Sequence, residues 1–220
     1  MKIIAINGSP RANGNTHALL VKALEGAHEA DTEFIDLYGL GDFKGCRSCF
    51  ACKQRDGQFY GKCAWIDGLS PVLEKIKAAD AVVIGSPVYL ADVSSAVRAL
   101  IERMIFPVFP YTKDMTSLLG KKVAMGLIFT MNVPKYMMLR MGYDKSFTLI
   151  QRYLRHFYGS CELMTANDTY QFDDYDKYVC IMFDEKHKAK VRADQFPKDC
   201  QKALEMGQKL IEQAKKFQSK

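Results

Sequence analysis

The sequence predicts an α/β fold in which a parallel sheet carries helices on both faces. Short apolar runs rich in β-branched residues alternate with segments whose apolar positions recur at helical spacing. The runs are continuously apolar, as expected of strands that are buried on both sides. The chain has 220 residues, is 48% hydrophobic and 25% charged, and contains no repeat. These properties suit one globular domain over residues 1–220.

The first half of the chain alternates strand, helix, strand, helix and strand. Glycine, serine and proline bound the apolar runs, and the segments between them show helical periodicity. A helix is expected to begin at Ser70-Pro71, because serine suits a helix cap and proline suits the first turn. The third strand is expected to end at Ser86-Pro87. The expected elements are strands at 2–8, 32–37 and 81–85 and helices at 16–27 and 70–79.

Two further strands and three further helices are expected in the second half. A helical face begins at Val93, and Pro107 and Pro110 are expected to stop that helix. Crossovers between parallel strands are right-handed, and so the helices cover both faces of the sheet. The expected elements are strands at 123–129 and from 161 and helices at 93–105, 147–157 and 197–217.

Three segments exceed what simple connections need: a cysteine-rich insert at about 43–66 and long insertions at about 131–145 and 169–194. Long insertions at strand ends usually shape a site or an interface. Four methionines of the second segment either pack in a core or subunit contact, or touch a bound ligand directly. They are Met131, Met137, Met138 and Met141.

Charge and hydropathy limit the partners. The chain has 31 Lys and Arg against 25 Asp and Glu, a net charge of +6, which suits small anionic ligands and is too diffuse to indicate nucleic acid. The longest apolar runs fall far short of the roughly 20 residues that a membrane span needs. The start, Met1-Lys2-Ile3, has no features of a signal peptide. We therefore expect a cytoplasmic protein with no membrane or nucleic-acid partner.

A polar loop joins the first strand to the first helix. Ligands of open parallel sheets bind beyond the carboxyl ends of the strands, where the strand order reverses. Hydroxyl, amide and guanidinium groups beside a helix N-terminus suit a phosphate. Because no triphosphate or dinucleotide motif is present, a monophosphate is favoured, and a merely polar turn is the alternative. The donors are the hydroxyls of Ser9 and Thr16, the amides of Asn13 and Asn15 and the guanidinium of Arg11.

A second segment, Ser86-Pro87-Val88-Tyr89, is expected next to this loop. Proline fixes the chain there, so that the backbone N–H groups that follow can face a flat heteroaromatic ring, and the tyrosine offers an aromatic surface. Taken alone, the tetrapeptide is equally well a structural turn. Together with the polar loop, it suggests a flavin whose phosphate lies between residues 9 and 16.

Four of the seven cysteines fall in one short segment, at Cys46, Cys49, Cys52 and Cys63. In a reducing compartment such a group indicates metal or redox chemistry rather than disulfides. Four thiolates are the number that a [4Fe-4S] cluster needs, and two successive C-x2-C steps favour iron. Zinc and free thiols are the alternatives. The four histidines form no metal-binding motif.

The two loop motifs, with cysteines between them, resemble those of the flavodoxin-like NAD(P)H-dependent FMN reductases, and specifically the iron-sulfur flavoproteins. The resemblance covers roughly residues 2–105. It implies a flavodoxin-like three-layer sandwich whose five-stranded parallel sheet has the order 2-1-3-4-5, and it implies bound FMN. The residues that match the family's phosphate-binding positions are Ser9, Arg11, Asn15 and Thr16, and those that match the positions beside the ring are Pro87, Val88 and Tyr89. Thr130 and Asn132 also resemble ring contacts.

The resemblance further implies an FMN-dependent NAD(P)H oxidoreductase. A nicotinamide would pass hydride to the flavin, which would then reduce an iron-sulfur cluster or an acceptor, with no essential acid or base from the protein. A homodimer or homotetramer is suggested. Ten residues separate Cys52 from Cys63, a longer gap than the family generally has, which puts the cluster in question. The alternatives are a flavodoxin-type electron carrier, against which the positive charge argues, and a zinc-stabilised binding module.

Overall fold

A computed structural model of the protein describes residues 1–219. Its sheet has the strand order β2-β1-β3-β5-β6, and every pairing along this path is parallel. The order of these five strands along the chain is thus 2-1-3-4-5, and the predicted α/β architecture is confirmed. The sheet has six strands rather than the predicted five, because a two-residue strand, β4 (Asp92–Val93), pairs antiparallel with the end of β3. The five parallel strands are β1 (Lys2–Asn7), β2 (Asp31–Asp36), β3 (Ala81–Tyr89), β5 (Val123–Thr130) and β6 (Gly159–Ala166).

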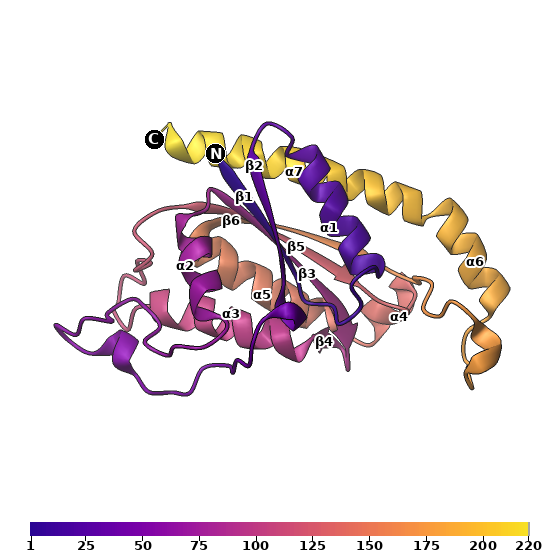
Figure 1. Cartoon of the computed structure of the whole chain (residues 1–220), viewed down its shortest axis with the longest axis horizontal. Helices are drawn as coiled ribbons and strands as arrows, with labels where there is room; N and C mark the ends of the chain where they lie inside the picture. Colours follow the sequence, from indigo (N-terminus) through magenta and orange to yellow (C-terminus); the bar gives the residue numbers. More distant parts are fainter. Residues whose placement is uncertain (220) are drawn as a thin grey trace.

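Helices cover both faces of the sheet, as Figure 1 shows. Alternate residues of β1 divide between two cores, because successive side chains of a strand point to opposite faces. Ile3 and Ala5 belong to one core, and Ile4 and Ile6 belong to the other. The first core is covered by α1 (Asn15–Gly26) and α7 (Phe196–Gln218), and the second by α2 (Ser70–Ala78), α3 (Ser95–Val108) and α5 (Tyr143–Tyr158).

Helices α1 and α7 approach each other backbone to backbone. A Cβ atom placed on Gly26 would lie 1.9 Å from the carbonyl oxygen of Leu204, and one placed on Gly207 would lie 1.9 Å from that of Ala23. No side chain fits at either position. The two glycines therefore set the close contact that fixes α7 along the sheet.

Two prolines do not end their elements as expected. Strand β3 runs through Pro87 to Tyr89, because its end pairs with β5 on one side and folds back on the two-residue antiparallel strand β4 (Asp92–Val93). Its other neighbour, β1, pairs only as far as Gly85, so that the missing N–H of Pro87 disrupts no ladder on that side. Pro107 lies within the last turn of α3, which ends one residue later.

The long insertions contain two helices that were not predicted: α4 (Lys135–Arg140) and α6 (Glu185–Asp194). The apolar periodicity that identifies an amphipathic helix is absent from α6, whose one buried residue is Lys188. Three-residue 3-10 turns occur at Leu37–Gly39, Ala51–Lys53 and Tyr175–Lys177. No helix within residues 1–219 has the length and apolar character that crossing a bilayer demands.

Candidate functional site

A cavity of about 810 Å³ opens at the carboxyl ends of β1, β3 and β5. Its size falls within the roughly 300–1,000 Å³ of ordinary small-molecule sites. It brings together the polar loop, the end of β3 and the end of β5. Nine of the ten residues predicted to bind a cofactor line it: Ser9, Arg11, Asn15, Thr16, Pro87, Val88, Tyr89, Thr130 and Asn132.

Ser86 is the tenth, and it does not line the cavity. Its side chain is fully buried. The hydroxyl accepts a hydrogen bond from the backbone N–H of Ser94 at 2.9 Å and donates to the carbonyl of Pro87 at 2.8 Å. The Ser86 hydroxyl therefore stabilises the β3–β4 turn and does not contact the cavity.

The polar loop is held in shape by its own side chains. The Ser9 N–H donates to Oδ1 of Asn7 at 3.1 Å, and the Arg11 N–H donates to the Ser9 hydroxyl at 3.1 Å. The Thr16 and Thr130 hydroxyls lie 2.8 Å apart and join the loop to β5. The N-cap of α1 is Gly14, and no side chain caps this helix end. Its first N–H groups are thus available to an anion, which the helix dipole also favours.

Residues 167–195, here named the C-terminal strap, form the opposite wall. Nδ2 of Asn15 donates to the carbonyl of Tyr170 at 2.8 Å, and a guanidinium N–H of Arg11 donates to that of Gln171 at 2.5 Å. The strap residues on the cavity wall are Thr169, Tyr170, Gln171, Phe172, Asp173, Tyr178 and Arg192. None of these residues was predicted individually as part of the site. The signal that pointed to them was the length of the insertion at 169–194.

A buried ion pair anchors the strap. The side chain of Lys188 is 1% exposed; its ammonium group pairs with Asp168 and donates to the carbonyl of Asn132 at 2.5 Å. Nε2 of His187 lies 2.6 Å from the same carboxylate. Burial raises the pKa of Asp168, but the hydrogen bonds from Lys188 and His187 lower it by more, so that the pKa lies below its ordinary value. The carboxylate is therefore charged at neutral pH.

Aromatic side chains also line the cavity. Phe172 and Tyr178 of the strap stack with ring centroids 4.2 Å apart, and Tyr89 contributes from the end of β3. Burial raises the pKa of Tyr89, which keeps its phenol neutral at physiological pH. Within residues 1–219, Oδ1 of Asn132 is buried without a hydrogen-bond partner, while the Nδ2 of this side chain donates to Gln171 at 2.6 Å. An unpaired buried acceptor on the wall suits a ligand that carries an N–H group.

The four clustered cysteines line a separate small recess, together with Arg103 and Phe106 among others. Cys46 and Cys49 are exposed, Cys52 is buried and Cys63 is half-buried. Ser48 and Phe50, on either side of Cys49, both have positive φ angles, of 51° and 56°. This conformation is uncommon for residues other than glycine and tends to occur at functional sites.

The arrangement of the four thiols can be compared with what a zinc ion and a [4Fe-4S] cluster each require. Within residues 1–219, no three His, Cys, Asp or Glu side chains lie close enough to share one metal ion. A zinc ion would need all four sulfurs about 2.3 Å from one point. A [4Fe-4S] cluster binds one thiolate at each iron and suits thiols spaced around a common recess. The donor set of four thiols around one small recess, of about 20 Å³, fits a cluster in kind and number.

Two cations hold the cysteine segment against α3. The side chain of Arg103 is 1% exposed, and it donates to both carboxylate oxygens of Asp67 at 2.6 Å and to the Trp65 carbonyl at 2.7 Å. Lys53 donates to carbonyls at the end of α3, including that of Phe109 at 2.5 Å. The fold of this segment therefore depends on contacts with residues far away in the sequence.

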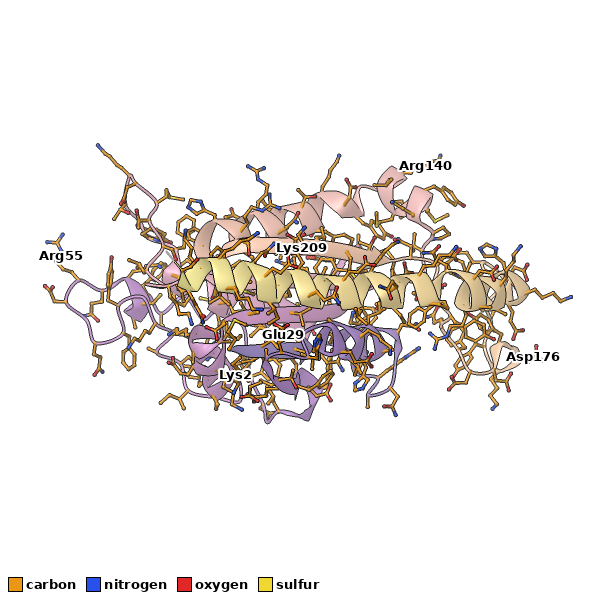
Figure 2. The ribbon with its side chains drawn as sticks, turned by 90° about the horizontal axis from the view of Figure 1, so that it is seen from above. Lys2, Glu29, Arg55, Arg140, Asp176 and Lys209 are labelled. Atoms are coloured by element: carbon orange, nitrogen blue, oxygen red, sulfur yellow. The ribbon has the colours of Figure 1, made fainter. Side chains whose placement is uncertain are left out.

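The cavity and the recess lie at opposite ends of α3 and share no lining residue. Ser94 caps the start of α3 beside the β3–β4 turn, and Phe106 near its end lines the recess. At 1.5 Å per residue, the helix from Ser95 to Phe106 is about 16 Å long. Figure 2 shows the same separation, with Arg55 of the cysteine segment and Asp176 of the strap at opposite ends of the molecule.

Comparison with protein families gives one match over most of the chain. The family model described as NADPH-dependent FMN reductase matches residues 1–175. An iron-sulfur flavoprotein of Methanocaldococcus jannaschii is 41% identical over 105 residues, which are 47% of this chain and 51% of the relative. Another, from Archaeoglobus fulgidus, is 38% identical over 106 residues, 47% of this chain and 48% of the relative. The chain thus spans about half the length of the curated relatives it matches.

Solved structures share the fold. An NAD(P)H:quinone oxidoreductase from Methanothermobacter marburgensis superimposes with a TM-score of 0.63 at 12% identity, covering 96% of each chain. An FMN-dependent NADH-azoreductase from Bacillus anthracis gives a TM-score of 0.63 at 15% identity, covering 95% of this chain and 98% of the other. At such low identity these structures establish the architecture alone.

Proposed function

Because the chain belongs to the family of NADPH-dependent FMN reductases, we propose that it binds FMN in the cavity at the carboxyl ends of the strands and oxidises NAD(P)H. The observation that carries this proposal is the composition of that one cavity. It combines the donor-rich polar loop at the start of α1 with aromatic side chains and with a buried acceptor, Oδ1 of Asn132, that is unpaired within residues 1–219. When bound, FMN supplies hydride acceptance and the onward transfer of electrons.

The polar loop would hold the phosphate. The Ser9 and Thr16 hydroxyls, the Asn15 amide, the Arg11 guanidinium and the N–H groups of the first turn of α1 supply donors around one anion. One N–H of the Arg11 guanidinium donates to the Gln171 carbonyl of the strap, and its other N–H groups remain available to the phosphate. This arrangement suits a single terminal phosphate.

The ring would lie against the ends of β3 and β5. Pro87, Val88 and Tyr89 form one side, and Thr130 and Asn132 form the other. Oδ1 of Asn132 would accept a hydrogen bond from an N–H of the ring and so orient it. The protein's part is to bind the ring, aim it and exclude water, and no side chain is required as an essential acid or base.

Steady-state kinetics with pure protein test the proposal. We expect about one FMN per chain and oxidation of NADH or NADPH when a flavin-reducible acceptor is present. Failure to bind FMN at saturating concentration would contradict the proposal. Full FMN occupancy without oxidation of either nicotinamide would instead support the flavodoxin-type electron carrier.

The four cysteines are proposed to hold a [4Fe-4S] cluster that takes electrons from the flavin or serves a further acceptor. Support comes from their common recess and from the relatives' description as iron-sulfur flavoproteins. Anaerobically purified protein is expected to contain iron and sulfide, and Cys52→Ser is expected to lose most of both while it keeps its FMN. Cys200→Ser, on α7, is the matched control and should retain the iron. Stoichiometric zinc in place of iron would refute the assignment.

A further inference from the structure

Arg192 lies beyond the residues that the family model matches, yet it reaches the phosphate-binding loop. It belongs to α6 in the C-terminal strap. A guanidinium N–H donates to Oδ1 of Asn15 at 2.8 Å, and the guanidinium carbon lies 4.0 Å from the ring centroid of Phe196. The stacked ring and the hydrogen bond together hold the cation at the first residue of α1.

The charges on the cavity wall favour an anion at this end. Three charged side chains line the cavity: Arg11, Asp173 and Arg192. Arg11 belongs to the polar loop, Arg192 donates to Asn15 of the same loop, and the first turn of α1 contains no acidic residue. A guanidinium has five donors, and the one contact of Arg192 with Asn15 leaves others for a phosphate oxygen.

We infer that Arg192 is a second phosphate-binding cation, so that the C-terminal strap is part of the cofactor site. This inference rests on the proposed binding of FMN. Arg11 and Arg192 then approach the phosphate from segments 181 positions apart in the sequence (192 − 11). A simpler role is conceivable for Arg192, as a latch that holds the strap on Asn15 without contact to the ligand. The two roles make different predictions for flavins with and without a phosphate.

The test compares Arg192→Met with the wild type in the binding of FMN and of riboflavin, followed by quenching of flavin fluorescence. Loss of a charge-assisted contact is expected to weaken FMN binding by about 10- to 100-fold. Riboflavin has no phosphate, so its dissociation constant should change by less than about twofold. Lys190→Met removes the same charge from an exposed position of α6 that does not line the cavity, and it should leave both ligands unaffected.

The other possible results of these titrations each exclude a contact between Arg192 and the phosphate or exclude the proposed function. Equal weakening of FMN and riboflavin would show that Arg192 only latches the strap, and unchanged FMN binding would show that it does not contact the phosphate; either result overturns the inference and leaves the proposed function standing. If the wild-type protein itself does not bind FMN, the proposed function fails and the inference falls with it.

Discussion

Replacing Arg103 with methionine is expected to lower the free energy of unfolding by about 3–5 kcal/mol, the usual cost of removing one partner of a buried ion pair. The substitution removes the cation whose Nη1 donates to both oxygens of the Asp67 carboxylate, which is 10% exposed, and it removes one of the hydrogen bonds to the Trp65 carbonyl. The segment that bears the cysteines should then detach from α3. Urea denaturation measures the loss of stability, and iron content measures the loss of the proposed cluster.

Arg55→Met is the matched control for this experiment. Arg55 is exposed at the tip of the same segment, as Figure 2 shows. The Arg55→Met variant should therefore unfold at the same urea concentration as the wild type. Arg103→Lys keeps the charge but loses the planar fork, and we expect it to recover only part of the stability. If Arg103→Met unfolds within about 1 kcal/mol of the control and retains its iron, Arg103 does not anchor the segment.

Replacing Lys188 with methionine is also expected to lower the free energy of unfolding by about 3–5 kcal/mol, because it removes one partner of a buried ion pair. The ammonium group is buried between Asp168 and the Asn132 carbonyl, and methionine satisfies neither. Because Asn132 lies on the cavity wall, FMN binding should weaken as well. Urea unfolding and flavin titration measure the two effects, with Lys190→Met on the same helix as control.

The loss of unfolding free energy in Lys188→Met should depend on pH. The pKa of Asp168 lies below its ordinary value in the folded protein, so that the unfolded chain binds its proton at the higher pH. The stabilisation by the ion pair is therefore complete above about pH 4, the ordinary pKa of an aspartate, and is lost as the pH falls through the folded value. The difference between wild type and Lys188→Met should shrink in that acidic range. The double variant Lys188→Met, Asp168→Asn should be more stable than Lys188→Met at neutral pH, and a double variant that is equally unstable would contradict this account.

The sheet could be predicted because its evidence is local. Each strand is a continuous apolar run, and each long helix has an apolar face that recurs along the chain, so that both are visible in a short window. Strand β3 was predicted too short because its last residues are stabilised by β4 and β5, which a window around Ser86-Pro87 does not contain. Helix α6 was missed because it is polar on nearly every side.

About half of the candidate site could be predicted from the sequence. The polar loop and the segment 86–89 concentrate donors and aromatic surface within a few consecutive residues, and a short stretch of sequence is enough to recognise them. The strap contributes through single long-range contacts, such as that between Arg192 and Asn15, which no local pattern records. Similarly, the spacing of the cysteines indicated the donor set, but the contacts of Arg103 that shape their recess come from a distant helix.

The backbone contact at Gly26 and Gly207 gives the C-terminal helix a mechanical role. It joins α7 rigidly to α1, the same helix whose first turn borders the polar loop, and so the end of the strap that enters α7 is fixed. The FMN proposed for the cavity would then enter or leave by local displacement of the residues between β6 and α6, while the sheet, α1 and α7 keep their positions. Its exchange would in this way be uncoupled from global unfolding.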